Sequence, residues 1–406
     1  MKVNILALDS ASAVCGVALL CVHQSQRQHY VVEHHGSTEH AERMLPLIDQ
    51  VLTQANLKRA DLDLIAFAQG PGGFTGLRVA CGVAQGLAYG LGLKVAAVPS
   101  LLGVAAQQAQ HDIETIEVVV ADARMQELYV GAYQQTTTGA WYALHKPMLI
   151  HHSQVLQYIQ HVLAQQQSFK NPSVLRVSGD GLVAFPDLLA SLQALPVHLG
   201  GTELPKATTI ADLAWLQYQH QQLIEPALAA PLYVRNRVAF TTAERETGLG
   251  GNPSSTWQAT HIRPAVATDL AEVAALEAEL QFAPWSQSAL ESSMASGHVL
   301  WVASQADKVV AYAVMMPAQE DWELLLIGVA PVAQRQGVAQ QLLCYAEQHA
   351  RAQGAKNIHL EVRASNQPAI ALYEGAGYVQ VGIRKNYYAL PEQQREDAVL
   401  YTKILA

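Results

Sequence analysis

Apolar and polar positions in the first part of the chain form short apolar runs and amphipathic segments. Val3–Asp9 and Val14–Val22 are apolar runs joined by four small residues, which predicts two strands and a turn. From Thr38 to Ala55 apolar residues recur at helical spacing, so we expect a helix there. Pro46 should kink this helix or move its start later along the chain.

The pattern then alternates between strands and helices. Leu62–Ala68 is apolar except for Asp63, which predicts a further buried strand. A glycine-rich loop follows, and a helix rich in small residues continues to Leu91. Ile116–Ala121 is a further apolar strand. The order β-β-β-α-β-α predicts an α/β fold for this part of the chain.

A different layout appears nearer the C-terminus. The predicted order is strand Glu323–Ala330, a turn at Gln334–Ala339 that opens a helix, strand Asn357–Arg363, a short helix through Tyr373 and a last strand near Ala398–Ile404. Between the two layouts, Thr241–Thr256 is rich in glycine and small polar residues and lacks apolar periodicity. We therefore expect a domain at residues 1–240, a flexible linker at 241–258 and an α+β domain at 259–406.

Composition narrows the classes of function. Half of the 406 residues are apolar, which rules out global disorder, and the net charge of −9 excludes a general nucleic-acid-coating protein. The four cysteines include no C-x-x-C pair, so neither a disulfide framework nor a Cys-based zinc site is expected. The N-terminal apolar runs are too short for a secretion signal or a membrane span. These features predict a soluble cytoplasmic protein without membrane contact.

The glycine-rich loop Gln69–Arg78 lies between a strand and a helix, which is where helices bind phosphate groups. A Walker loop, however, ends in Gly-Lys-Ser/Thr, and Thr75-Gly76-Leu77 offers no lysine. We therefore interpret the glycines as requirements of a tight turn and of close helix–strand packing. Nucleotide binding is the alternative.

Three strings in the first domain resemble the TsaB (YeaZ) family over residues 1–240. They are Gly70-Pro-Gly-Gly-Phe-Thr-Gly-Leu-Arg78, Asp122-Ala-Arg-Met125 with Tyr129, and Pro231-Leu-Tyr-Val-Arg-Asn236. The resemblance implies a two-lobed fold of the actin/Hsp70 (ASKHA) type and a non-catalytic subunit in tRNA threonylcarbamoyladenosine biosynthesis. Its implied partners are the catalytic TsaD subunit and TsaE, with tRNA reached only through the complex.

The resemblance also implies a docking surface and the absence of a metal. In the family, two helices, here Thr38–Ala55 and Phe74–Leu91, pair with TsaD or form a homodimer. The catalytic relative binds a metal through His-x-x-x-His, whereas here His40 is followed by Met44, so no metal is expected. Gln69 departs from the family, in which arginine is frequent at this position, and this leaves an anion contact there in doubt.

The turn at 334–339 follows an apolar strand and opens a helix, so its backbone N–H groups form a cradle suited to a pyrophosphate. The residues that supply these groups are Arg335, Gln336, Gly337, Val338, Ala339 and Gln340. Gly337 allows a close approach of the ligand. A helix cap without a ligand is the alternative.

Strings around this turn resemble the RimI family over residues 259–406. They are Pro284-Trp-Ser286, Leu360-Glu-Val-Arg-Ala-Ser-Asn366, Ala369-Ile-Ala-Leu-Tyr373, Arg384-Lys-Asn-Tyr-Tyr388 and Arg395-Glu-Asp397. The resemblance implies a GNAT-fold acetyltransferase that uses acetyl-CoA to modify the N-terminal alanine of a small-subunit ribosomal protein.

Acetyl transfer needs a neutral amine, so a base must take a proton from the α-ammonium group. By resemblance Glu361 is this base and Tyr373 the acid that protonates the leaving thiolate; a structural ion pair and a core aromatic are the alternatives. Asn366 would hydrogen-bond the pantetheine arm, and the strand residues Ile327, Gly328 and Val329 would pair with it.

The sequence thus predicts a bifunctional fusion, with a TsaB-type scaffold followed by a protein N-terminal acetyltransferase. One alternative is an active nucleotide-dependent phosphotransferase fused to a small-amine acetyltransferase. Another is that both parts are interaction modules only.

Overall fold

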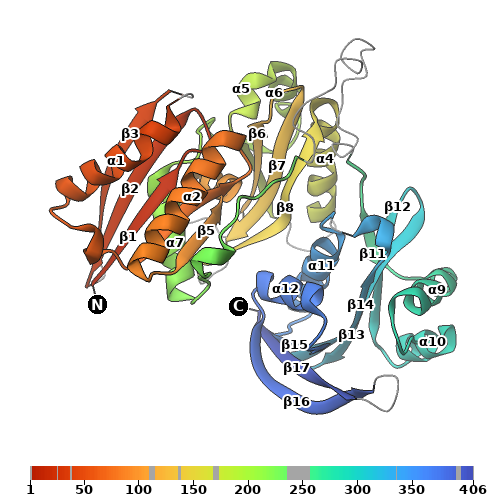
Figure 1. Ribbon diagram of the computed structural model, residues 1–406. Helices are drawn as coiled ribbons and strands as arrows, with labels where there is room; N and C mark the ends of the chain where they lie inside the picture. Colours follow the sequence, from red (N-terminus) through yellow and green to blue (C-terminus); the bar gives the residue numbers. More distant parts are fainter. Residues whose placement is uncertain are drawn as a thin grey trace, which may run out of the picture. The chain divides into compact units, whose positions relative to one another are not determined.

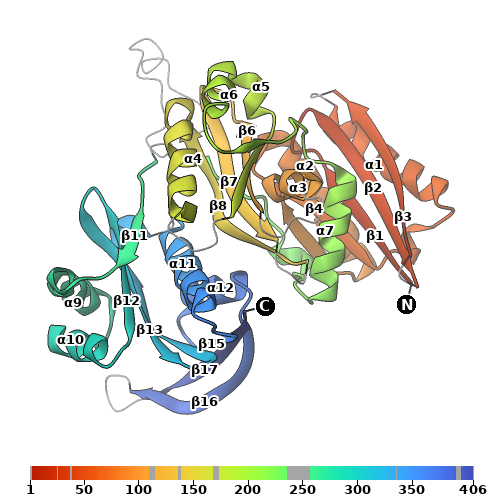
Figure 2. The ribbon, with the colours of Figure 1, turned by 180° about the vertical axis from the view of Figure 1, so that it is seen from behind.

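The computed structural model describes residues 2–24, 26–36, 39–108, 115–135, 139–167, 173–235, 257–334, 336–389 and 395–405 (Figures 1 and 2). By its contacts the chain divides into two compact units. The first comprises residues 1–133, 147–160 and 173–257, and the second comprises 134–146, 161–172 and 258–406. Nearly all of the predicted linker lies outside the described residues, so its flexibility stays a prediction.

The first sheet has the strand order β3-β2-β1-β4-β5. Its strands are β1 Lys2–Asp9, β2 Val14–His23, β3 Gln26–His35, β4 Leu64–Gly70 and β5 Val95–Pro99. Strand β1 pairs with β2 antiparallel and with β4 parallel, so it lies at the centre of the sheet. This position explains why β1 is buried almost throughout, whereas the edge strand β3 is largely polar and exposed.

Helices cover both faces of this sheet. Helices α1 His40–Gln54 and α2 Phe74–Leu91 lie on one face, and α7 Ala207–Gln219 lies on the other (Figures 1 and 2). Helix α1 begins two residues later than the pattern predicts, at His40, and Pro46 lies within it. The core between the sheet and the helices α1 and α2 contains Leu6, Leu8, Val17, Leu19, Met44, Ile48, Ile65, Phe67, Ala80 and Ala84.

The second sheet has the order β10-β9-β6-β7-β8. Its strands are β6 Thr115–Asp122, β7 Glu127–Gln135, β8 Trp141–His151, β9 Val174–Ser178 and β10 His198–Leu199. The remaining elements of this region are α3 Ser100–Gln108, α4 His152–Gln167, α5 Gly181–Ala184, α6 Pro186–Leu192 and the 3₁₀ turns η1 Arg59–Asp61 and η2 Pro226–Leu228. The two sheets with their helices give the predicted α/β class.

The C-terminal sheet is mixed, with the order β11-β12-β13-β14-β15-β17-β16. Its strands are β11 His261–Pro264, β12 Val299–Gln305, β13 Lys308–Ala318, β14 Asp321–Val329, β15 Asn357–Arg363, β16 Val379–Ala389 and β17 Arg395–Ile404. Among the described residues, β14 and β15 form the only parallel pair of this sheet. The predicted strand at 357–363 is confirmed to the residue.

Two helical layers enclose this sheet, and β12 shows why. Its residues alternate between two cores, because successive side chains of a strand point to opposite faces. Leu300 and Val302 pack with α9 Leu270–Leu280 and α10 Gln287–Ala295. Trp301 and Ala303 pack with α11 Val338–Ala352 and α12 Gln367–Gly375. Short 3₁₀ turns, η4 Ala267–Asp269 and η5 Pro331–Ala333, precede α9 and α11.

The glycine-rich loop before α2 is packed onto the turn between β1 and β2. The N–H of Gly73 donates to the carbonyl of Ala11 over 2.7 Å, and the Ser10 hydroxyl donates to the carbonyl of Gly76 over 2.8 Å. A Cβ at Gly76 would overlap the Ser10 carbonyl, and one at Gly72 would overlap that of Ala11. Close backbone packing accounts for these two glycines, in agreement with the interpretation from the sequence.

This packing predicts opposite effects for two glycine substitutions on α2. Gly76→Ala should lower the free energy of unfolding by about 1–3 kcal/mol or more, because backbone must move to admit the methyl group. Gly86→Ala should raise it by about 0.5–1 kcal/mol, because alanine is the better helix former and no atom lies within 4 Å of its Cβ. Urea unfolding of both variants measures the difference. Equal stabilities would show that the loop does not press on the β1–β2 turn.

Candidate functional site

Strands β14 and β15 separate before either strand ends. Their register pairs Asp321–Leu324 with Asn357–Leu360, whereas β14 continues to Val329 and β15 to Arg363. On its other side β14 stays paired with β13 as far as Val329, with Leu325 left out of the register. The last residues of β14 therefore present a strand edge toward β15. Such an edge can pair with an extended ligand as an added strand would.

The predicted turn follows this edge directly. The side-chain amide of Gln334 donates to the carbonyl of Val329 over 3.0 Å, which ties the turn to the end of β14. Gly337 is the N-cap of α11 and has φ 80°, a conformation that favours glycine. A Cβ there would meet only the Gln341 side chain, at 3.9 Å, so this glycine stands in open space. Helix α11 thus begins with unpaired backbone N–H groups beside an uncrowded glycine.

The other residues predicted for this cradle differ in exposure. Gln336 is exposed, Ala339 is half-buried, and Val338 and Gln340 are buried. Val338 belongs to the apolar core below the helix, so only its backbone can face a ligand. Arg335 lies outside the described residues.

Glu361 lies on β15 at the first position beyond the paired segment. Its neighbours Leu360 and Val362 point into the core beneath α11 and α12, so Glu361 points to the opposite face of the sheet. Its carboxylate Oε1 forms an ion pair with Nη1 of Arg384 on β16, and its side chain is 15% exposed. Glu361 is thus a charged, accessible group at the mouth of the strand opening.

Tyr373 lies on α12 and is 5% exposed within the core that Leu360 and Val362 also share. Its ring packs against Tyr378 and Tyr401, with centroids 5.8 and 6.5 Å away. Burial raises the pKa of its hydroxyl well above the ordinary value, so this group carries its proton at neutral pH. Glu361 and Tyr373 approach the end of β15 from opposite faces.

Arg363, Arg384 and Tyr388 lie near Glu361, and the sequence alone indicates no role for them. Arg363 lies two positions along β15 from Glu361. Its guanidinium carbon is 5.0 Å from the ring centroid of Tyr388 and 5.8 Å from that of Phe282. Burial, and then the charge of Glu361, raises the pKa of Tyr388 to about 12. Arg384 and Tyr388 belong to a string that the sequence analysis used only as a mark of family.

Asn366 is the N-cap of α12. Its side-chain oxygen accepts the N–H of Ala369 over 3.3 Å, and the residue is exposed. The capping bond occupies the oxygen and fixes the side chain, so the amide NH₂ is the group left to face a ligand.

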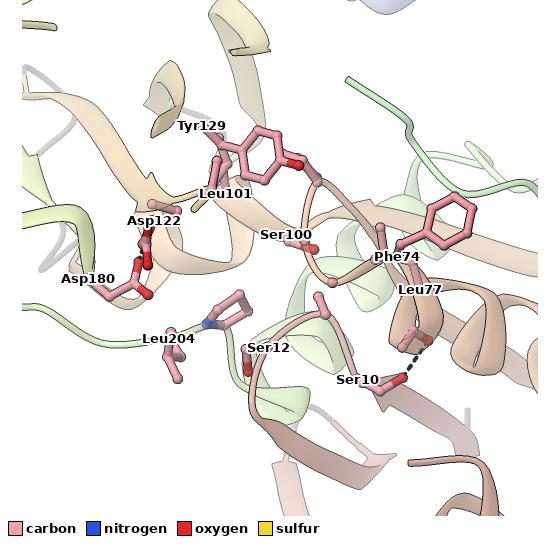
Figure 3. Close-up of a pocket in the computed structure, with 18 of the residues that line it drawn as sticks. Ser10, Ser12, Phe74, Leu77, Ser100, Leu101, Asp122, Tyr129, Asp180 and Leu204 are labelled. Atoms are coloured by element: carbon pink, nitrogen blue, oxygen red, sulfur yellow. Dashed lines mark hydrogen bonds between the residues drawn. The ribbon is translucent and has the colours of Figure 1, made fainter. Parts of the chain in front are cut away.

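The first unit contains a cleft of 650 Å³. Figure 3 shows Ser10, Ser12 and Leu77 on one side and Asp122, Tyr129 and Asp180 on the other. The two carboxylates lie side by side, and Oδ1 of Asp180 accepts the N–H of Asp122 over 3.0 Å. Burial raises the pKa of Asp180. Arg124 forms an ion pair with Asp122 over 3.1 Å, so this wall of the cleft carries charges of both signs.

The segment Pro231–Arg235 fastens one side of this cleft to the other. The N–H of Leu232 donates to the carbonyl of Gln69 over 2.7 Å, and the Gln69 side chain donates to the carbonyl of Ala230 over 3.0 Å. At its far end Arg235 forms an ion pair with the buried Glu127 over 2.5 Å. Gln69, the departure from the family pattern, therefore anchors this segment.

His40 and Met44 have separate structural roles. Nε2 of His40 lies 3.1 Å from the carbonyl of Ser12, and Met44 is fully buried in the apolar core. Within the described ranges, no cluster of three or more His, Cys, Asp or Glu side chains is arranged to hold a metal. None of the helices in the same ranges is long and apolar enough to cross a membrane.

Two family models match the chain. The model of the TsaD family, described as tRNA N6-adenosine threonylcarbamoyltransferase, matches residues 23–244, and that of the acetyltransferase (GNAT) family matches residues 268–378. With the folds described above, these matches define a two-domain α/β protein, with a YeaZ-like domain of the ASKHA type followed by a GNAT-fold domain with a mixed sheet.

Relatives divide along the same lines. The tRNA threonylcarbamoyladenosine biosynthesis protein TsaB of Escherichia coli (strain K12) is 31% identical over 242 residues, which cover 58% of this chain and 96% of TsaB. The [Ribosomal protein bS18]-alanine N-acetyltransferase of Haemophilus ducreyi is 32% identical over 139 residues, 34% of this chain and 96% of that enzyme. An uncharacterized protein of Mycobacterium leprae is 27% identical over 396 residues, 95% of each chain.

The chain belongs to the TsaD family, among whose members it is related to TsaB, and its C-terminal part belongs to the GNAT family alongside the bS18-alanine N-acetyltransferases. Both resemblances stated from the sequence are thereby confirmed.

Asp9, at the end of β1, provides a test of the electrostatics behind the cleft. It is 2% exposed, and burial raises its pKa from 3.8 to about 7. The folded protein then holds this proton between about pH 4 and pH 7 while the unfolded chain releases it, so stability falls as the pH rises through that window. Asp9→Asn keeps an oxygen for the N–H of Ala11 and removes the charge.

This variant should therefore gain stability at pH 8, by at most about 4 kcal/mol, and little at pH 4. Calorimetric melting at the two pH values measures the gain. The exposed Asp307→Asn serves as a control and should show no such pH dependence. A gain from Asp9→Asn that is the same at both pH values would contradict the buried-carboxyl explanation.

Proposed function

We propose that this chain performs two tasks in the cytoplasm. Residues 259–406 would transfer an acetyl group from acetyl-CoA to the N-terminal alanine of a small-subunit ribosomal protein. Residues 1–240 would act as a non-catalytic subunit in tRNA threonylcarbamoyladenosine biosynthesis. The observation that carries the enzymatic proposal is the opening between β14 and β15 with Glu361 at its mouth.

The fit of acetyl-CoA rests on two features of the same strand–turn–helix unit. The open edge of β14 offers backbone groups to the pantetheine arm, and the start of α11 offers N–H groups to the pyrophosphate. The residues we assign to this binding are Ile327, Gly328, Val329, Arg335, Gln336, Gly337, Val338, Ala339, Gln340 and Asn366.

The proposed chemistry is a direct transfer. Glu361 takes a proton from the peptide's α-ammonium group, and the neutral nitrogen forms a bond to the acetyl carbon as the carbon–sulfur bond breaks. Tyr373 gives its proton to the departing thiolate, a role that suits a hydroxyl whose raised pKa keeps it protonated. The nitrogen loses its second proton as the amide forms, and this proton restores the Tyr373 hydroxyl by way of solvent. No metal takes part in this scheme.

The alternative of a phosphotransferase in the first domain is not favoured. The glycine loop lacks the lysine of a Walker loop, and Gly72 and Gly76 are packed against the backbone of Ala11 and Ser10. Neither feature favours a nucleotide phosphate. We therefore propose that this domain supports its partners without chemistry of its own.

The exposed face of α2 is our proposed docking surface for TsaD, in a complex that would also include TsaE and through which tRNA would be reached. Ala80 and Ala84 of this helix are fully buried, so they cannot form this surface. Instead Gly82, Gly86 and Gly90 have no atom within 4 Å of their Cβ positions. The exposed aromatic side chains of Phe74 and Tyr89 lie on the same helix. Because the glycines have no side chains, a helix of the partner could approach the backbone of α2 closely. A second copy of this chain is the alternative occupant.

The enzymatic proposal is tested by mass spectrometry of a ribosomal-protein N-terminal peptide incubated with acetyl-CoA and the full chain. Glu361→Gln removes the base at constant shape and should lower the rate by about 10²–10⁴-fold. Tyr373→Phe should also lower the rate, while both variants still bind acetyl-CoA in calorimetry.

Small amines serve as competing substrates in the same assay. Acetylation of small amines in preference to the peptide would favour the alternative activity. Wild-type rates in both variants would remove Glu361 and Tyr373 from the mechanism.

The docking proposal predicts that Gly86→Glu abolishes binding to TsaD, because it would bury an unpaired charge at a cost of several kcal/mol. Val183→Glu, at a 65% exposed position on α5, is the matched control and should leave binding intact. Pull-down with TsaD and threonylcarbamoylation in a reconstituted system are the measurements, with peptide acetylation expected to persist. If Gly86→Glu binds TsaD normally, the docking surface lies elsewhere.

A further inference from the structure

Two arginines lie on the same face of the C-terminal sheet as Glu361. Across the register, Arg363 on β15 faces Ala398 on β17, which faces Arg384 on β16. In the next row Glu361 faces Leu400, which faces Gly382. Residues directly opposite one another share a face of the sheet. Arg384 therefore reaches Glu361 diagonally across β17.

Small residues along β17 and β16 make this reach possible. Ala398 on β17 is buried and has only a methyl side chain, and Gly382 on β16 has no side chain. The long Arg384 side chain can therefore lie over β17. Nη1 of Arg384 meets Oε1 of Glu361. The guanidinium carbon of Arg384 also lies 5.4 Å from the ring centroid of Tyr387, a cation–π contact that helps to hold the side chain.

The nearer arginine does not take this position. The guanidinium of Arg363 lies instead between the rings of Tyr388 and Phe282. The pairing with Arg384 is therefore selective. Among the described residues, Oε2 of Glu361 forms no ion pair, so this oxygen is the one left to face a substrate.

We propose that Arg384 is a positioning residue, which holds the Glu361 carboxylate by one oxygen so that the other can accept the proton of the peptide amine. This inference rests on the proposed role of Glu361 as the base. A base held by a third group is oriented before the substrate arrives, as in catalytic triads. Arg384 itself need not touch the substrate.

A purely structural role makes a different prediction. Arg384 is 53% exposed, and an ion pair with so exposed a member adds little to stability. Replacing it should therefore leave the melting temperature and the binding of acetyl-CoA unchanged. The effect should appear in kcat for peptide acetylation.

The experiment compares Arg384→Ala, Arg384→Lys and Lys385→Ala in the full chain, alone and combined with Glu361→Gln. Lys385 is the neighbouring exposed cation and serves as the matched control. Arg384→Ala should lower kcat about 10–100-fold, as loss of an orienting partner does, and Arg384→Lys should recover much of it. Lys385→Ala should act as wild type.

The double variant decides whether Arg384 acts through Glu361. In the Glu361→Gln background, Arg384→Ala should change kcat by less than about twofold, because residues that act as one unit are not additive. Full additivity, a wild-type kcat in Arg384→Ala or a fall in melting temperature would each overturn the inference. Failure of the wild-type chain to acetylate the peptide would instead overturn the proposed function.

Discussion

Backbone hydrogen bonds join β14 and β15 only as far as Leu324 and Leu360. Beyond that point both strands continue, and the polar groups along the facing edge of β14 need partners from elsewhere, since buried backbone groups are rarely left unpaired. A ligand with an extended, amide-bearing chain meets that need. The separation also places Glu361 at the first free position of β15 and lets the turn after Val329 follow directly. The arrangement of the proposed acetyl-CoA site follows from this local loss of pairing.

Glycine has opposite meanings in the two strand–turn–helix units of this chain. At Gly76 a side chain would overlap the Ser10 carbonyl, so the glycine marks close packing of the loop on the β1–β2 turn. At Gly337 the space is open and φ is 80°, so the glycine marks a backbone shape that leaves the helix start accessible. Both loops carry glycine between a strand and a helix. What a Cβ would meet distinguishes them.

Elements governed by local pattern could be predicted from the sequence. The strand Asn357–Arg363 and the helix from Phe74 to Leu91 have their expected bounds. Apolar runs and the glycines that flank them determine these bounds locally. Contacts across the sheet could not be predicted. The pairing of Arg384 with Glu361 depends on β17 lying between their strands, and that of Arg235 with Glu127 depends on how a segment distant in sequence crosses the cleft. The burial of Ala80 and Ala84 likewise depends on which face of α2 meets the sheet.

Asp9 in the first domain and Glu361 in the second are carboxyl groups in very different surroundings. Asp9 is buried, and within the described ranges no ion pair compensates it, so burial raises its pKa to about 7. Glu361 has a guanidinium beside one oxygen and retains some exposure to solvent. A carboxylate that must exchange protons with a substrate needs access and a fixed orientation, and the second site supplies both. Asp9 has neither access nor a counter-ion, which suits a carboxyl that serves packing.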